Sequence, residues 1–146
     1  MNIKYTLLFI LFFICLSNFA QNKADDVTGV WLTAGDDPAR IQIYRSGDQF
    51  FGKIIWLKIP LKNGVERRDT KNPKNENHSN QIIGLLLLKN FKFDNKDEWK
   101  GGEIYDPESG KTYRSYLYFK DKNTLKVRGF IGISLIGRTE TWTRVK

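Results

Sequence analysis

The stretch ARIQIYRSGDQFFGKIIWL, residues 39–57, decides the fold. Within it, Ile41 and Ile43 alternate with polar or amphipathic residues, which is the period of a strand with one buried face. Gly47-Asp48 then supplies a tight turn of the kind that joins antiparallel strands. The stretch therefore predicts a β-hairpin, with strands at residues 39–46 and 49–57.

Short β-branched and aromatic runs, separated by turn residues, continue on both sides of this hairpin, and no stretch holds a helical period. Six further strands are predicted, at residues 27–33, 84–94, 99–105, 112–119, 124–133 and 137–145. Short connections favour antiparallel neighbours, so the expected class is all-β, as a closed up-and-down barrel of about eight strands or a sandwich. Closure has the advantage of removing exposed strand edges.

Residues 1–20, MNIKYTLLFILFFICLSNFA, have the pattern of a secretory signal peptide. Lys4 supplies positive charge, an almost wholly apolar run follows, and Ala20 ends the stretch with the small residue that is typical of a cleavage site. That run is shorter than the roughly 20 apolar residues of a transmembrane helix. We expect cleavage after Ala20, export to the periplasm or beyond the cell, no membrane span after cleavage, and one domain at 21–146.

The residues needed for metal or nucleophilic chemistry are scarce. His78 is the only histidine, and Cys15, the only cysteine, would leave with the signal peptide. Lipidation of a cysteine normally requires a small residue directly before it. Ile14 is large, so the pattern does not indicate lipidation of Cys15. A zinc ligand set is missing, the acidic clusters lack calcium-loop spacing, and no nucleophile has a base beside it. We expect no catalytic residue, no metal and no cofactor.

The formal net charge is +8, and the loss of Lys4 would lower it by one. Nucleic-acid binding needs basic residues gathered on one face, whereas here they are spread through every segment. We therefore expect no nucleic-acid partner, and a general attraction to anionic surfaces of the cell envelope instead.

The segment GGEIYDPESGKTY, residues 101–113, contains two carboxylates but has the pattern of a hairpin turn. Asp106 stands where a turn residue bonds its own backbone, Pro107 follows at the second position, and Gly110 stands where the chain needs positive φ. A general acid and base need two carboxyls in different environments of a cleft. A structural turn is the preferred interpretation.

Residues 58–81 do not fit the strand rhythm, because they are polar, rich in asparagine and without periodicity. Such a long connection is expected to act as a lid, a binding loop or a disordered excursion.

The aromatic residues are the other chemical signal. Most belong in the core, but a few are expected to line a cavity where Tyr116 or Arg128 fixes a polar head group.

The motifs GVW, residues 29–31, and TETWTR, residues 139–144, resemble the lipocalin and fatty-acid-binding-protein pattern. In that pattern a glycine-any-tryptophan start packs at the closed end of a barrel beneath a basic residue of the last strand. The resemblance implies a structural barrel plug, in which a guanidinium stacks on an indole. Its residues would be Gly29, Trp31, Trp142, and Arg144 or Arg138.

A longer series of motifs resembles the domain-of-unknown-function family 2147 of small exported bacterial proteins. The series is GVW, FGKIIWL (51–57), DTKNP (69–73), IIGL (82–85), WKGGEIYDPESGKTY (99–113) and LKVRGFIGISLIGRTETWTR (125–144). The resemblance implies one lipocalin-like antiparallel barrel without an established biochemical activity. The chain departs from the pattern at 74–81, where the family usually has a basic residue and a proline, so an anion site built with that residue is not carried over.

These observations favour a non-catalytic protein that binds a small apolar or amphipathic molecule in the cell envelope, with residues 58–81 as its lid. Candidate ligand-binding residues are Tyr116 and Arg128, together with Trp56, Asp69 and Asn72, which stand at positions that the resembling family's pattern marks. The alternative is a filled barrel that acts as a surface-binding module for an envelope protein or an anionic polymer. An enzyme is the third hypothesis, with Asp69 as its candidate acid.

Overall fold

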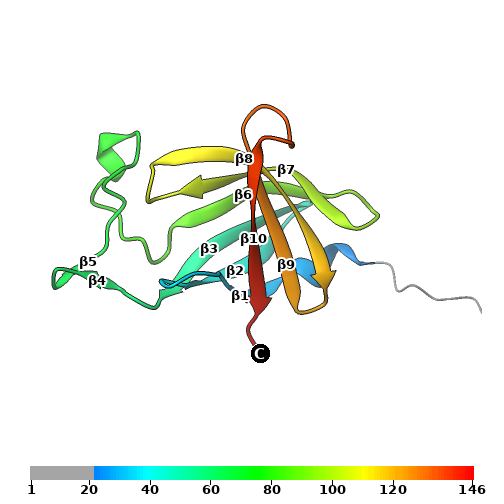
Figure 1. Ribbon diagram of the computed structural model, residues 1–146, viewed down its shortest axis with the longest axis horizontal. Helices are drawn as coiled ribbons and strands as arrows, with labels where there is room; N and C mark the ends of the chain where they lie inside the picture. Colours follow the sequence, from blue (N-terminus) through cyan, green and yellow to red (C-terminus); the bar gives the residue numbers. More distant parts are fainter. Residues whose placement is uncertain (1–21) are drawn as a thin grey trace, which may run out of the picture.

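The structure is a computed structural model that describes residues 22–146, so the predicted signal peptide at 1–20 lies outside the described residues. Eight antiparallel strands form a closed barrel, in the order β1-β10-β9-β8-β7-β6-β3-β2 (Figure 1). The strands are β1 (Gly29–Leu32), β2 (Ala39–Ser46), β3 (Gln49–Leu57), β6 (Leu86–Phe93), β7 (Glu98–Asp106), β8 (Lys111–Asp121), β9 (Thr124–Phe130) and β10 (Gly137–Arg144). The prediction of a closed antiparallel barrel is confirmed.

The strand bounds follow the sequence pattern closely. The hairpin β2–β3 has the predicted bounds, and the ends of the other strands lie within three residues of the prediction. The largest difference is in β9, which ends at Phe130 because the chain turns back there, with Ile131 N donating to Ile136 O at 3.1 Å. No helix within residues 22–146 has the length and apolar character needed to cross a membrane.

The barrel interior holds one continuous apolar core. Along each strand the inward positions are buried while their neighbours face outward, as the pleat of a strand requires. Three of the four tryptophans are fully buried, and Trp99 contacts the rings of Phe50, Phe93 and Phe119. Phe91 packs in the same core against Gly102, where a Cβ would lie 2.4 Å from its ring.

Two residues of the predicted plug, Trp31 and Arg144, lie together at one end of the barrel. The guanidinium carbon of Arg144 lies 4.2 Å from the ring centroid of Trp31, and Arg144 donates to the backbone oxygens of Thr28 and Asp26. The 3₁₀ turn η1 (Ala24–Val27) precedes β1 here, and Val27 O accepts from Trp31 Nε1 at 2.9 Å. Of the two candidate arginines, Arg144 is the one that covers the tryptophan.

The other plug residues lie at different depths. A Cβ on Gly29 would stand 3.0 Å from Arg144 Nη1, so a glycine permits the close approach. Trp142 is also buried, and it lies two residues before Arg144 on β10. Arg138 lies at the opposite end of β10, highly exposed and 3.7 Å from Glu140.

The connection between β3 and β6 is more regular than expected. It contains the short hairpin β4 (Leu61–Lys62) and β5 (Val65–Glu66), and the 3₁₀ turn η2 (Asn75–Asn77). Asn63 and Gly64 join the two strands with φ of 53° and 76°, as the Asn-Gly pair favours. Figure 1 shows this hairpin projecting from the barrel. Residues 58–81, which have no periodicity in the sequence, therefore contain two short regular elements.

Candidate functional site

A cavity of about 520 Å³ occupies the barrel at the end opposite the Trp31–Arg144 plug. Its wall is mainly aliphatic and includes inward positions of strands β2, β3, β6, β7, β9 and β10. These wall residues include Ile41, Ile54, Leu87, Ile104, Val127 and Trp142. Connections β1–β2, β7–β8 and β9–β10 surround the opening, together with Arg67 and Ile82 of the long β3–β6 connection. The chain thus builds an apolar chamber with a mouth made of loops.

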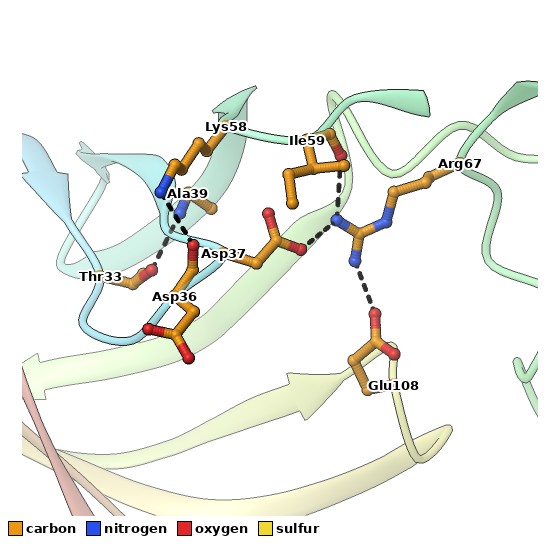
Figure 2. A network of polar contacts seen from close by, with 8 residues as sticks. All are labelled: Thr33, Asp36, Asp37, Ala39, Lys58, Ile59, Arg67 and Glu108. Atoms are coloured by element: carbon orange, nitrogen blue, oxygen red, sulfur yellow. Dashed lines mark hydrogen bonds and ion pairs between the residues drawn. The ribbon is translucent and has the colours of Figure 1, made fainter. Parts of the chain in front are cut away.

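A guanidinium joins three of these loops at the mouth (Figure 2). Arg67 Nη1 donates to Asp37 Oδ2 at 2.6 Å and to Ile59 O at 3.1 Å, while Nη2 donates to Glu108 Oε1 at 2.6 Å. Burial alone would lower the pKa of Arg67, but the two carboxylates outweigh it and raise that pKa above its ordinary value. We call Arg67, Asp37 and Glu108 the mouth clamp.

Neighbouring bonds fix the β1–β2 loop that carries Asp37. The Lys58 ammonium donates to Asp36 O at 3.1 Å, and Ala39 N donates to Thr33 Oγ1 at 2.9 Å (Figure 2). The loop is therefore tied to the end of β3 and to its own base. Asp37 is presented to Arg67 from a constrained backbone.

Beside the clamp, a buried polar pair joins the long connection to the barrel. Tyr105 Oη donates to Asp69 Oδ1 at 2.6 Å, and Asn72 Nδ2 donates to Asp69 Oδ2 at 2.7 Å. Asp69 is completely buried. Burial and then the bond to Asp69 raise the pKa of Tyr105 to about 12, so the phenol stays a donor at neutral pH. Asp69 and Asn72, both candidate ligand-binding residues, are thus brought together.

Asn72 organises the rest of the long connection. Its side-chain oxygen accepts from Lys74 N and Asn77 Nδ2, and its backbone oxygen lies 2.7 Å from His78 Nε2. Neither Asp69 nor Asn72 is among the residues that line the cavity. Their observed partners are protein groups, which fits a role in holding the connection against β7.

The β7–β8 turn forms the third part of the mouth. Asp106 Oδ1 accepts from Glu108 N at 2.9 Å, Oδ2 accepts from Ser109 Oγ, and Gly110 N donates to Asp106 O. Gly110 has φ of 72°, and a Cβ on it would lie 1.9 Å from Lys71 O, so only glycine fits. Pro107 follows Asp106 and lines the cavity.

The remaining candidate ligand-binding residues lie on the outer face of the barrel. Trp56 is 37% exposed and packs under the guanidinium of Arg40 at 4.8 Å. Tyr116 stacks on Tyr118, and Arg128 donates to Ser134 O. None of the three lines the cavity. Their role in ligand binding stays a prediction, and it does not concern this chamber.

The mouth clamp itself was missed by the sequence reasoning. The pattern of residues 101–113 indicates a turn at Glu108, and neither Asp37 nor Arg67 belongs to a motif that indicates a site. Within the described part of the chain, no group of three or more histidine, cysteine, aspartate or glutamate side chains is arranged to hold a metal ion. The site therefore offers an apolar chamber with charged groups at its opening.

Comparisons with known proteins agree with this architecture. The family model described as "Uncharacterized protein conserved in bacteria (DUF2147)" matches residues 29–144. A solved structure, described as "Protein HP1028 from the human pathogen Helicobacter pylori belongs to the lipocalin family", is similar with a TM-score of 0.74 and 20% sequence identity. The alignment covers 82% of this chain and 83% of that chain. This likeness establishes the fold. No curated protein matches the chain.

Proposed function

Because the chain belongs to the bacterial family of uncharacterized proteins DUF2147, we propose its function from its own geometry. We propose that it is a non-catalytic binding protein for a small apolar or amphipathic molecule. The cavity carries the proposal: about 520 Å³ lies within the usual range for small-molecule sites, roughly 300 to 1,000 Å³. A lipocalin-like barrel is compatible with this role.

The aliphatic wall explains why the ligand would have an apolar body. Transfer of apolar surface from water into such a chamber contributes about 25 cal/mol per Å². The inner wall residues, among them Ile41, Leu87 and Val127, offer few polar groups that would have to be desolvated. Affinity would therefore come mainly from burial.

The opening supports a preference in the polar end of the ligand. Its lining includes the carboxylates Asp37, Asp106, Glu108 and Glu140, against the guanidiniums of Arg67 and Arg138. Arg67 is already shared between two of the carboxylates. Since like charges repel at close range, a neutral or cationic head group fits this mouth better than an anionic one.

We also propose that the protein acts in the cell envelope, in the periplasm or outside the cell. The support is the signal-peptide pattern of residues 1–20. Export would place the barrel beside membranes, where apolar and amphipathic molecules gather.

Two linked experiments test the binding function. Native mass spectrometry of protein purified without detergent should show a discrete added mass that disappears on denaturation. Displacement of an apolar fluorophore by amphiphiles of equal chain length, with anionic, neutral and cationic heads, then ranks the ligands. If none of the amphiphiles displaces the fluorophore and the native mass is that of the protein alone, the proposal is refuted.

Matched variants locate the binding to the chamber. Ile104→Trp places a large ring at the cavity wall and should weaken fluorophore binding at least about tenfold, because it displaces the ligand. Ile55→Trp makes the same change on the outer face, where Ile55 is 38% exposed, and should leave binding unchanged. Equal effects of the two variants would place the site elsewhere.

The alternative of a filled barrel that works only through its surface has less support. It requires an interior without room for a ligand, and the volume of the chamber weighs against that premise.

A further inference from the structure

The connection between β9 and β10 exposes an unusual amount of aliphatic surface. Ile131, Ile133, Leu135 and Ile136 have relative exposures of 65%, 59%, 85% and 63%. Figure 1 shows this loop standing clear of the barrel at the top of the view. Contiguous exposed aliphatic residues on a soluble domain mark a contact surface. We call residues 131–136 the apolar tip.

The apolar tip is a braced structure. Ile131 N donates to Ile136 O and Ile136 N donates to Ile133 O, both at 3.1 Å. From the neighbouring strands, Arg128 Nε donates to Ser134 O at 2.8 Å, and Arg114 Nη1 reaches Gly132 O at 3.4 Å. Several backbone groups of the tip are thus bonded within the loop or from the neighbouring strands, while its four aliphatic side chains stay more than half exposed.

The same contacts place positive charge around the base of the apolar tip. Arg114 and Arg128 bond to its backbone, and Arg138 follows it on β10 with a highly exposed side chain. We call these three residues the arginine collar. Glu140 is the carboxylate that approaches the collar, at 3.7 Å from Arg138, and both groups are exposed. An exposed ion pair at that distance neutralises little of the positive charge of the arginine collar.

We propose that the apolar tip and the arginine collar dock the protein on the surface of an anionic phospholipid bilayer. Aliphatic side chains that enter the boundary between head groups and acyl chains gain burial, while flanking cations meet the lipid phosphates. The highly exposed guanidinium of Arg138 suits this task because its donor fork matches phosphate oxygens, whereas Arg128 donates to Ser134 O and Thr139 Oγ1 and contributes its charge alone. The arginine collar lies between the apolar tip and the body of the barrel. Aliphatic side chains that enter the acyl region would therefore leave the guanidiniums at the level of the lipid phosphates.

The position of the apolar tip relative to the cavity strengthens the proposal. Ile131 and Ile136 line the mouth of the chamber and are also more than half exposed. An apolar surface therefore runs from the chamber to the tip without a polar break at these residues. A second copy of this chain is a poorer occupant, because a symmetric contact of two tips would bring two arginine collars together.

Co-flotation with vesicles tests the docking surface. Vesicles of phosphatidylglycerol and phosphatidylcholine should carry the protein, vesicles of phosphatidylcholine alone should carry much less, and raised salt should weaken the binding. The double variant Ile133→Ser with Leu135→Ser should lose at least about tenfold in vesicle affinity, because two aliphatic anchors are removed. Its matched control is Leu61→Ser with Val65→Ser, on the exposed β4–β5 hairpin, which should bind as the wild type does.

All proteins compared must carry the same N-terminus, established by intact mass, so that differences arise in the loop. Equal binding by the tip variant and the wild type would overturn the proposal, as would equal losses in the tip variant and its control. Loss of a dimer in sedimentation velocity, caused by the tip variant without loss of vesicle binding, would assign the surface to self-association instead. Fluorophore displacement, measured on the same samples, reports ligand binding in the cavity. A failure of vesicle docking can thereby be distinguished from a failure of the proposed binding function.

Discussion

The phenol oxygen of Tyr105 lies 2.6 Å from Oδ1 of Asp69, and both side chains are buried. This bond joins β7 to the long connection that follows β3. It is charge-assisted, and Asn72 satisfies the second carboxylate oxygen at 2.7 Å. A buried acid that is fully bonded by protein groups has a structural role in holding the connection to the barrel.

Asp69→Asn should lower the free energy of unfolding by about 1.5 to 3 kcal/mol, because charge-assisted bonds are lost and the new amide meets the amide of Asn72. Chemical denaturation measures this change. Glu76→Gln, in the same connection but exposed, should change stability by less than about 0.5 kcal/mol. Equal stability of the two variants would refute the structural role.

The raised pKa of Tyr105 predicts a loss of stability at high pH. Since this pKa is about 12 in the folded state against an ordinary 10.0, the unfolded chain releases the proton first. The contribution is complete below pH 10 and is lost as pH rises towards 12. The difference in unfolding free energy between the wild type and Tyr105→Phe should therefore shrink across that window. Ionisation of Tyr105 below pH 10, followed by tyrosinate absorbance, would contradict the assignment.

Arg144→Lys should destabilise the closed end of the barrel by about 2 kcal/mol, because one ammonium cannot replace the guanidinium over Trp31 and its bonds to separate backbone oxygens. Thermal or chemical unfolding gives the value. Arg138→Lys is the control and should have almost no effect, since Arg138 is highly exposed. The reverse order would assign the plug to Arg138.

Ser115→Ala should raise the free energy of unfolding by about 1 kcal/mol. The side chain is 2% exposed, and its hydroxyl has no hydrogen-bond partner among the described residues. Removal of that hydroxyl ends a desolvation cost and leaves only a small void. A clear loss of stability in chemical denaturation would indicate that the hydroxyl has a partner, such as a bound molecule.

Arg67→Met should speed the exchange of a bound fluorophore several-fold, because it breaks the clamp between Asp37 and Glu108 while leaving the chamber wall intact. Stopped-flow measurement of association and dissociation tests this. Arg45→Met removes an ion-paired arginine at the other end of the barrel and should not change either rate. Unchanged rates in Arg67→Met would show that the ligand enters by another route.

The architecture was predictable because strand signals are local. In residues 39–57 the alternation and the glycine turn fix both strands, and β2 and β3 have those bounds. The face of the barrel on which Trp56 lies could not be predicted in the same way. Simple alternation puts Trp56 on the same side as Ile54, but the register shifts between these residues, since Arg40 pairs with Trp56 and Ile41 pairs with Ile54. A bulge of one residue exchanges the two faces of a strand.

The mouth clamp was out of reach of sequence reasoning for a different reason. Asp37, Arg67 and Glu108 belong to three connections that are far apart in the chain, and each looks like an ordinary surface charge. Their meeting depends on how the β3–β6 connection folds back over the barrel. The buried bond between Tyr105 and Asp69 is one of the contacts that hold this path, and no local pattern reveals it.

The pairing of β1 with β10 also governs how the chain reaches its native state. Trp31 and Arg144 are register partners, although they come from opposite ends of the described chain. Hairpins between successive strands need only short loops to close, whereas this seam must join the two ends of the domain. During synthesis the ribosome still holds β10 when β9 emerges, so the nascent chain keeps two open edges. The barrel therefore gains this seam only once β10 is available to pair with β1, and until then two strand edges stay open.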